Sequence, residues 1–206
     1  MSGLFLSVLL LGLLSTAVPE AGASTRTERW GKGWSDDDKD CQDTRAELLI
    51  KNSKDEIKFK RIPGLYPIVV ANRGNRTMPG KSFCNVTQGR WIDLYTGTTV
   101  RVANDLDVDH IVPLNHAWEV GASNWSMKRR RLFYNDVDNL ILVSKGENRS
   151  KGDKDIVEYL PPRQGFRCEY AIRWEFVKKK WGLSIPRAEA QKIAEVKAHY
   201  CTAVER

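Results

Sequence analysis

The chain opens with a strongly apolar segment and then becomes mixed in character. Leu4–Leu14 form an apolar core, and small residues follow at Ala21–Ala23. This order is typical of a secretory signal peptide, and the core is too short for a membrane span, which needs roughly 20 residues. We therefore expect residues 1–23 to be removed, with cleavage after Ala17 as the lesser alternative. The remaining protein should be secreted, with no membrane-embedded part.

The next segment is polar and gives way to a helical pattern. Residues 24–43 include the acidic run 36–40 and predict a flexible polar arm. The acidic run could bind a cation, but closely spaced carboxylates repel unless a fold organises them. Residues 44–51 then show helical spacing, with Leu48 and Leu49 facing inward.

The middle of the chain alternates between irregular and strand-like patterns. Residues 62–79 are rich in Pro, Gly and Asn, which indicates an irregular connection. Residues 90–94 and 98–102 flank a turn that contains Gly97. This pattern predicts two strands joined by a tight turn, with glycine where a positive φ is needed.

Two further elements follow before the C-terminal third. Ser126 is placed to cap a short helix that runs through residues 128–134. Residues 140–143 are continuously apolar and predict a buried strand. Ser144 and Glu147 then have the spacing of a capping box, which predicts a helix directly after that strand.

The C-terminal third predicts a pair of antiparallel helices. Gly182 suits the end of the first helix, and residues 185–204 form the second. Helical spacing places these residues on the inward faces: Tyr170, Trp174, Val177 and Trp181 in the first helix, and Ile193, Val196 and Tyr200 in the second. The whole pattern indicates one α+β domain over residues 44–206, with flanking helices.

Cysteine usage agrees with an oxidising compartment. The cysteines are Cys41, Cys84, Cys168 and Cys201, and two disulfides are the expected state. Zinc ligation is the weaker alternative, because no pair has Cys-x-x-Cys spacing. We favour Cys41–Cys84 with Cys168–Cys201, since the antiparallel helices bring the last two together.

The charge balance favours a polyanionic partner. The net charge is +7, and loss of residues 1–23 removes only Glu20 among the charged residues, which raises it to +8. Excess positive charge favours binding to phosphates through counterion release, although solubility alone also explains a basic secreted protein.

The chemistry-bearing residues cluster around the segment Asp107–Leu114. Asp109 offers a hard oxygen ligand beside His110, a candidate general base, and the strand end before Pro113 would let both face one site. Asn139 could orient the imidazole, and Asn148 could supply a second oxygen ligand. One Mg²⁺ with a carboxylate, an amide oxygen and several waters would suffice for phosphodiester hydrolysis.

Several basic residues are candidates for phosphate contact: Lys151 and Arg149 beside Asn148, and Arg130 and Arg131 in the run 128–131. The alternative for the run is a solvated helix face. His116 is favoured as a packing residue over a metal ligand, and His199 as a helix-surface residue. Asn148 also begins an N-glycosylation sequon, as do Asn75, Asn85 and Asn124, so a glycoprotein is expected if the source glycosylates, with Asn148 unmodified.

The segment Asp107–Pro113 resembles the core of the HNH nucleases, also called ββα-metal or His-Me finger nucleases. The nine positions from Asn139 to Asn148 match the spacing in the HNH core of RNA-guided CRISPR nucleases. A wider likeness to small secreted HNH-family proteins of bacteria and fungi covers roughly residues 44–201. It runs through segments 89–97, 116–122, 135–136, 148–154 and 168–171, and ends at Cys201.

The resemblance implies a ββα-metal core at about residues 91–155. It assigns Asp109 and Asn148 as metal ligands, His110 as the base and Asn139 as its orienting partner. The metal would be Mg²⁺, with Mn²⁺ as an alternative, while the asparagine at position 148 disfavours Zn²⁺.

The expected activity is a secreted, monomeric endonuclease that cleaves DNA, with RNA as an alternative substrate, at low sequence specificity and leaving a 5′-phosphate. The rival is a secreted, basic protein that binds nucleic acid or another polyanion through an inactive HNH fold.

Overall fold

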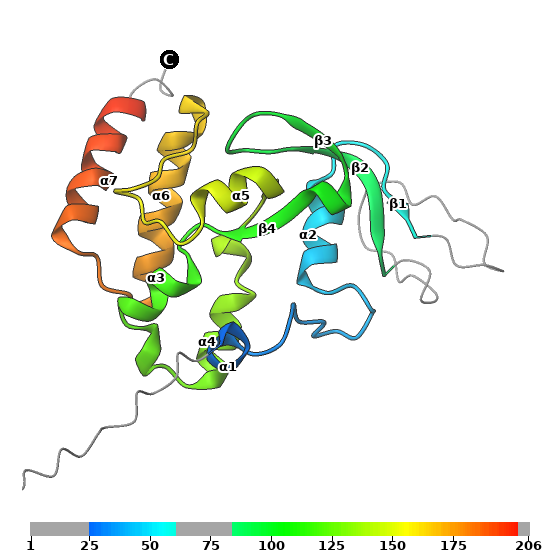
Figure 1. The fold of residues 1–206 in the computed structure, drawn as a ribbon, viewed down its shortest axis with the longest axis horizontal. Helices are drawn as coiled ribbons and strands as arrows, with labels where there is room; N and C mark the ends of the chain where they lie inside the picture. Colours follow the sequence, from blue (N-terminus) through cyan, green and yellow to red (C-terminus); the bar gives the residue numbers. More distant parts are fainter. Residues whose placement is uncertain (1–24, 61–83, 202–206) are drawn as a thin grey trace, which may run out of the picture.

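The computed structural model describes residues 25–60 and 84–201 (Figure 1). Its helices are α1 (Arg26–Trp30), α2 (Thr44–Asn52), α3 (Leu114–Glu119), α4 (Met127–Tyr134), α5 (Lys145–Lys151), α6 (Gln164–Trp181) and α7 (Arg187–Tyr200). Short 3-10 turns cover Ala103–Asp105, Ala122–Asn124 and Val137–Asn139. The strands are β1 (Lys58–Phe59), β2 (Val86–Ile92), β3 (Thr99–Val102), β4 (Leu106–His110) and β5 (Leu140–Ser144). The expected α+β class is confirmed.

The strands form two separate antiparallel sheets. One has the order β1-β2-β3, and the other pairs β4 with β5. The predicted strand–turn–strand unit is β2 and β3, and Gly97 in the turn has a φ of 83°. Asp93 ties this unit to the second sheet, because its carboxylate accepts from the Tyr95 and Ser144 amides at 2.9 and 3.1 Å.

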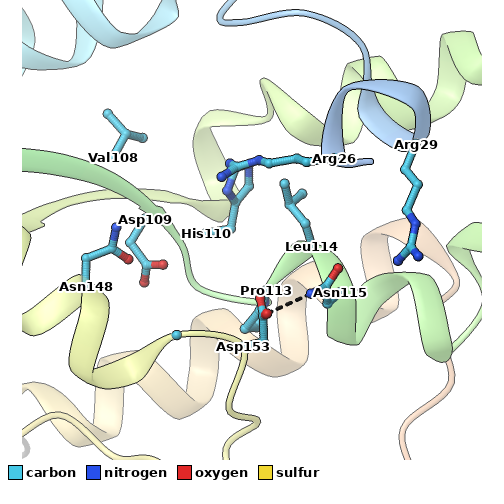
Figure 2. Close-up of a pocket in the computed structure, with 11 residues that line it drawn as sticks. Arg26, Arg29, Val108, Asp109, His110, Pro113, Leu114, Asn115, Asn148 and Asp153 are labelled. Carbon is cyan, nitrogen blue, oxygen red and sulfur yellow. Dashed lines mark hydrogen bonds between the residues drawn. The ribbon is translucent and has the colours of Figure 1, made fainter. Parts of the chain in front are cut away.

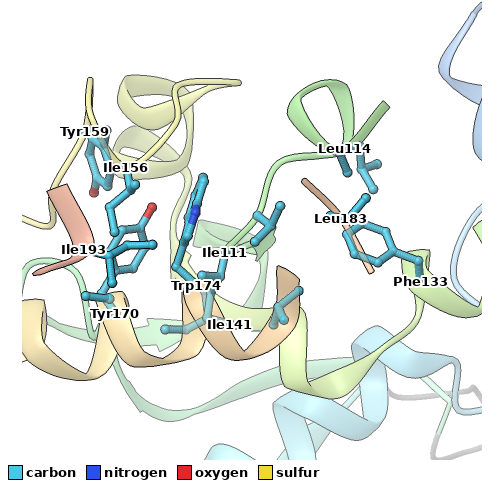
Figure 3. Packing of buried hydrophobic residues seen from close by; sticks show 14 of the residues in the cluster. Ile111, Leu114, Phe133, Ile141, Ile156, Tyr159, Tyr170, Trp174, Leu183 and Ile193 are labelled. Carbon is cyan, nitrogen blue, oxygen red and sulfur yellow. The ribbon is translucent and has the colours of Figure 1, made fainter. Parts of the chain in front are cut away.

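The β4–β5 ribbon lies between two hydrophobic clusters. Alternate residues of a strand point to opposite faces. Leu140 and Leu142 accordingly pack into one cluster with Trp91, while Ile141 and Val143 pack into the larger one. Figure 3 shows Ile141 in that larger cluster, beside the aromatic residues of α6. Burial on both faces explains why residues 140–143 of β5 are all apolar.

The C-terminal helices form the predicted antiparallel pair (Figure 1), and both contribute residues to the larger cluster. Tyr170 and Trp174 are fully buried on α6, and Gly182 ends the helix in the left-handed conformation. Cys168 and Cys201 are joined in a disulfide across the pair, as favoured from the sequence.

The expected polar arm is folded onto the domain in its described part, residues 25–43. Trp30 on α1 is 1% exposed and packs against Phe133 of α4 at a ring distance of 5.6 Å. Trp34 packs against Tyr134 at 4.7 Å. The prediction of a flexible arm is therefore wrong here, because two tryptophans within a polar segment provide enough apolar surface to hold it.

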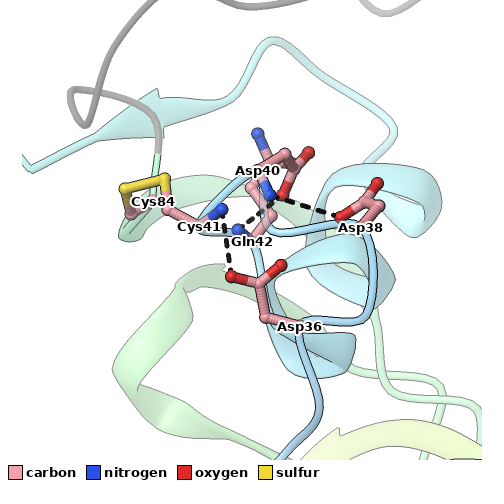
Figure 4. Close-up of a disulfide and its surroundings, with 6 residues drawn as sticks. All are labelled: Asp36, Asp38, Asp40, Cys41, Gln42 and Cys84. Atoms are coloured by element: carbon pink, nitrogen blue, oxygen red, sulfur yellow. Dashed lines mark hydrogen bonds between the residues drawn. A yellow bond between two sulfur atoms is a disulfide. The ribbon is translucent and has the colours of Figure 1, made fainter.

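The acidic run lies beside the second disulfide, Cys41–Cys84, which also has the favoured pairing (Figure 4). Its carboxylates accept from backbone amides: Asp36 from Cys41 at 3.1 Å and Asp40 from Gln42 at 2.7 Å. These bonds shape the turn that leads into α2.

The predicted capping box at the start of α5 is absent. The Ser144 side chain makes no cap bond to the helix. Glu147 instead accepts from the Tyr159 hydroxyl at 2.7 Å. Ser126 does cap α4, accepting from the Arg129 amide at 3.3 Å. The predicted signal peptide, the connection at 62–79 and the sequon at Asn75 lie outside the described residues.

Candidate active site

The candidate site lies between the end of β4 and the helix α5. Asp109 and His110 are the last residues of β4, and Asn148 is on α5, which follows β5 directly. Two antiparallel strands and a helix therefore bring these three residues together, as the sequence predicted. They line a cleft of about 460 Å³ (Figure 2).

His110 is held by burial and by one hydrogen bond. Its side chain is 4% exposed, and the Trp34 ring stacks on it at 5.7 Å. Its Nε2 lies 2.9 Å from the Tyr134 carbonyl oxygen. Since a carbonyl only accepts, Nε2 carries the proton, and Nδ1 of the neutral ring is left as the basic nitrogen.

The His110 imidazole is strongly biased toward its neutral form. Burial lowers its pKa to about 3, and the positive charges of Arg26 and Lys151 act in the same direction, against the opposing bond to Tyr134. A base that stays unprotonated at neutral pH is the result.

Asn139 does not contact the imidazole. Its side-chain oxygen accepts from the Val112 amide at 2.8 Å, and its nitrogen donates to the Val112 carbonyl at 3.1 Å. The Asn139 carbonyl also accepts from the Ile111 amide at 2.8 Å. The predicted orienting bond to His110 is therefore corrected: Asn139 fixes the chain just after His110, and Tyr134 orients the ring.

Asp109 is surrounded by donors. Lys151 Nζ lies 3.1 Å from Oδ1 and 3.0 Å from Oδ2, and the Tyr95 hydroxyl donates to Oδ2 at 2.8 Å. Burial raises the pKa of Asp109, although Lys151 and Tyr95 oppose that rise. Burial and the nearby Asp109 charge also raise the pKa of Tyr95, so its hydroxyl stays protonated and donates.

Lys151 is not a phosphate-contact residue. It is 0% exposed, and besides Asp109 it donates to the His110 carbonyl at 2.9 Å. A side chain enclosed in this way cannot reach a substrate without unfolding its surroundings. The prediction for Lys151 is therefore wrong. Its ammonium group neutralises the buried Asp109 carboxylate and does not face solvent.

The amide oxygen of Asn148 is a candidate ligand atom on the cleft. Its nitrogen donates to Asp107 Oδ2 at 3.1 Å, which fixes the orientation of the amide. The oxygens of Asp109 and Asn148 on the same cleft form a donor set of the type that Mg²⁺ or Mn²⁺ accepts, with water completing the shell. This donor set fits a hard cation and offers no thiolate.

The other predicted basic residues lie away from the cleft lining. Arg130 is directed to the Trp118 ring at 5.1 Å, and Arg131 donates to the Gly33 carbonyl. Arg131 therefore helps to hold the N-terminal segment against α4, whereas Arg130 contacts α3. Arg149 is exposed on α5 but does not line the cleft.

Two arginines that the sequence reasoning missed do line it. Arg26 and Arg29 reach the cleft from α1 (Figure 2). Their signal was present in the sequence, because Thr25 and Glu28 have capping-box spacing, and the structure contains both bonds of that box. The pattern marks a helix start inside the segment for which a polar arm was expected.

His116 has the packing role that was favoured for it. Its Nε2 lies 2.8 Å from Glu189 Oε1, beneath α6 and α7. Glu189 and Asp155 are close enough to complete a metal-ligand group with it. However, Lys178 Nζ lies 3.0 Å from His116 and 2.6 Å from Glu189, so an ammonium group already occupies the position of a cation.

Comparison with known families gives the class of protein. The family model for the C-terminal domain of GmrSD restriction endonucleases matches residues 71–196. The chain belongs to this HNH-type nuclease family.

A curated relative also matches part of the chain. An uncharacterized secreted protein of Arthroderma benhamiae is 38% identical over 115 residues, which cover 55% of this chain and 56% of that protein. The chain thus spans about half the length of this relative. No solved structure matches. Among residues 25–60 and 84–201, no helix has the length and apolar character needed to cross a membrane.

Proposed function

We propose that the protein is a secreted, metal-dependent endonuclease that hydrolyses phosphodiester bonds of DNA with low sequence specificity, and that β4, β5 and α5 are its ββα-metal core. The observation that carries this proposal is the His110 imidazole, bonded through Nε2 to the Tyr134 carbonyl, on the same cleft as Asp109 and Asn148. Family membership and the secreted relative support the nuclease class and the extracellular location. RNA is the second substrate to test.

In this mechanism His110 is the general base. Its Nδ1 accepts a proton from a water that attacks phosphorus, while the Tyr134 carbonyl holds Nε2–H and stabilises the imidazolium. The negative charge of a bound phosphodiester raises the pKa of the imidazole relative to the free protein. The low pKa of the free state is thus partly reversed when substrate enters.

Asp109 and Asn148 are the residues that would hold the cation. When bound, a divalent cation supplies charge neutralisation at the phosphoryl oxygens and the leaving oxygen. Lys151 and Tyr95 fix the Asp109 carboxylate, and Asp107 fixes the Asn148 amide. The chain therefore sets both oxygen donors before any cation arrives.

Plasmid nicking with purified variants tests the proposal. His110→Ala and Asn148→Ala should each abolish EDTA-sensitive nicking while remaining folded at the assay temperature, although loss of the buried His110 ring should lower the melting temperature. His199→Ala is the matched control, since His199 is an exposed histidine on α7. The wild-type protein should be assayed with Mg²⁺, Mn²⁺, Zn²⁺ and EDTA on DNA and RNA. Undiminished nicking by both site variants would reject the mechanism.

One observation favours the rival function, an inactive HNH fold that binds polyanions. Lys151 contacts both oxygens of Asp109, and its ammonium already balances the charge that a cation would balance. Calorimetry with Mn²⁺ separates the two functions. Binding of Mn²⁺ that is lost in Asn148→Ala supports the nuclease, whereas polyanion binding with neither Mn²⁺ binding nor cleavage supports the rival.

A further inference from the structure

The helix α1 lies outside the residues that match the family model, yet it forms one wall of the cleft. It is anchored by Trp30, which packs against Trp118 and Phe133 at ring distances of 6.4 and 5.6 Å. Its first turn is fixed by Thr25 and Glu28, whose capping bonds measure 3.2 and 2.6 Å. The position of α1 is therefore part of the fold.

Arg26 and Arg29 project from this helix into the cleft. Residues three apart share one face of a helix. The Arg26 guanidinium lies over the Tyr134 ring at 5.4 Å, and the carbonyl of the same residue bonds to His110. The Arg29 guanidinium lies over the Trp118 ring at 5.0 Å. The aromatic rings thus hold both guanidinium groups at the cleft edge, and each group carries five N–H donors.

The rest of the cleft lining complements this basic wall. Opposite α1, the lining includes Asn148 and Asp153, and Asp153 accepts from the Asn115 amide at 2.7 Å. Arg26 and Arg29 are the basic residues among the lining side chains. If a nucleic-acid strand lay with one phosphate beside His110, the positively charged side chains nearest to its other phosphates would be those of α1.

We propose that Arg26 and Arg29 form a clamp for the phosphates that neighbour the scissile one on the substrate strand, each arginine contacting one phosphate. One guanidinium group can donate two parallel N–H bonds to the oxygens of a phosphate. The clamp would therefore fix the register of the strand relative to His110. The proposal rests on the proposed function and adds a substrate-binding role for the N-terminal segment.

A purely structural role for these arginines makes a different prediction. If they served only to hold α1 through Tyr134 and Trp118, their loss would lower the melting temperature. It would leave the salt dependence of DNA binding by the folded protein unchanged. The number of phosphates contacted sets that dependence, so the salt slope separates the two roles.

The test measures binding of a fluorescently labelled DNA duplex in EDTA across a salt series, followed by cleavage kinetics with metal. In Arg26→Ala/Arg29→Ala the slope of log Kd against log salt should fall by about two, with KM raised and kcat changed by less than about threefold. Arg26→Lys/Arg29→Lys should keep most of the slope. Arg163→Ala/Arg187→Ala is the control, because both arginines are exposed and neither lines the cleft.

The outcomes are distinct. An unchanged slope in the double alanine variant, with normal wild-type binding and cleavage, overturns the clamp alone, and so does an equal loss in the control. A wild-type protein that neither binds nor cleaves nucleic acid overturns the proposed function together with the clamp. If the double variant does not fold, each single variant should lower the slope by about one, and an unchanged slope in both overturns the clamp.

Discussion

Replacing Lys151 with methionine should destabilise the protein without directly removing a substrate contact. Lys151→Met keeps the length of the side chain and removes its charge. The variant loses two contacts to Asp109, at 3.1 and 3.0 Å, and one to the His110 carbonyl at 2.9 Å. It leaves the Asp109 carboxylate, which is 6% exposed, without its cationic partner.

The size of the effect follows from these contacts. Two unit charges about 3 Å apart attract by about 5 kcal/mol at an effective dielectric constant near 20. Breaking a buried ion pair by removing one partner typically costs about 3–5 kcal/mol. We expect Lys151→Met to lose about that amount from a total stability that for most domains is about 5–15 kcal/mol.

Urea unfolding at neutral pH with intact disulfides, followed by tryptophan fluorescence, measures this loss. The double variant Asp109→Asn/Lys151→Met should lose about 1–3 kcal/mol less than the sum of the single variants, because the double change leaves no uncompensated charge. If Lys151→Met instead unfolded within about 0.5 kcal/mol of the wild type and bound DNA with a smaller salt slope, Lys151 would be a phosphate contact and our assignment would be refuted.

Three further predictions concern the rest of the fold. Burial alone would raise the pKa of Glu189, but hydrogen bonds from its neighbours outweigh burial and hold it below its ordinary 4.5, so its stabilisation is present above that pH and lost as the pH falls further. Glu189→Gln should therefore unfold more easily at pH 6 and lose less additional stability on acidification than the wild type; parallel pH profiles would contradict this. Replacing Cys168 and Cys201 with serine opens a loop with a sequence separation of 33 and should cost about 4 kcal/mol in urea unfolding, and a loss below about 1 kcal/mol would contradict the estimate. Ser126→Ala should lower the free energy of unfolding by about 1 kcal/mol, because Ser126 caps α4. Ser144→Ala removes no cap bond and should lower it by less than about 0.5 kcal/mol; equal losses would indicate that Ser144 does cap α5.

The local elements were predictable because their signals are short in range. The apolar run at Leu140–Val143 predicted β5, and the aromatic spacing from Tyr170 to Trp181 predicted α6. The helix pair then placed Cys168 next to Cys201. Each inference needed only the periodicity of one or two neighbouring segments.

The partners of polar side chains were predicted less well. Asn139 was expected at the imidazole and contacts Val112, while Glu147 was expected at a helix start and contacts Tyr159. In each case the sequence allows several possible donors or acceptors as partners. The three-dimensional fold decides which of these groups are buried away from water. The buried groups are the ones that form hydrogen bonds within the protein.

The sequence by itself determined that Asp109, His110 and Asn148 stand at a strand end and on the helix after the next strand, since that follows from order and periodicity. Only the tertiary structure decided that Lys151 would be enclosed with Asp109 and that Arg26 would reach the same cleft. The physical reason is that burial and distance between segments far apart in the chain set both contacts. No local pattern encodes which distant charge must neutralise a buried carboxylate.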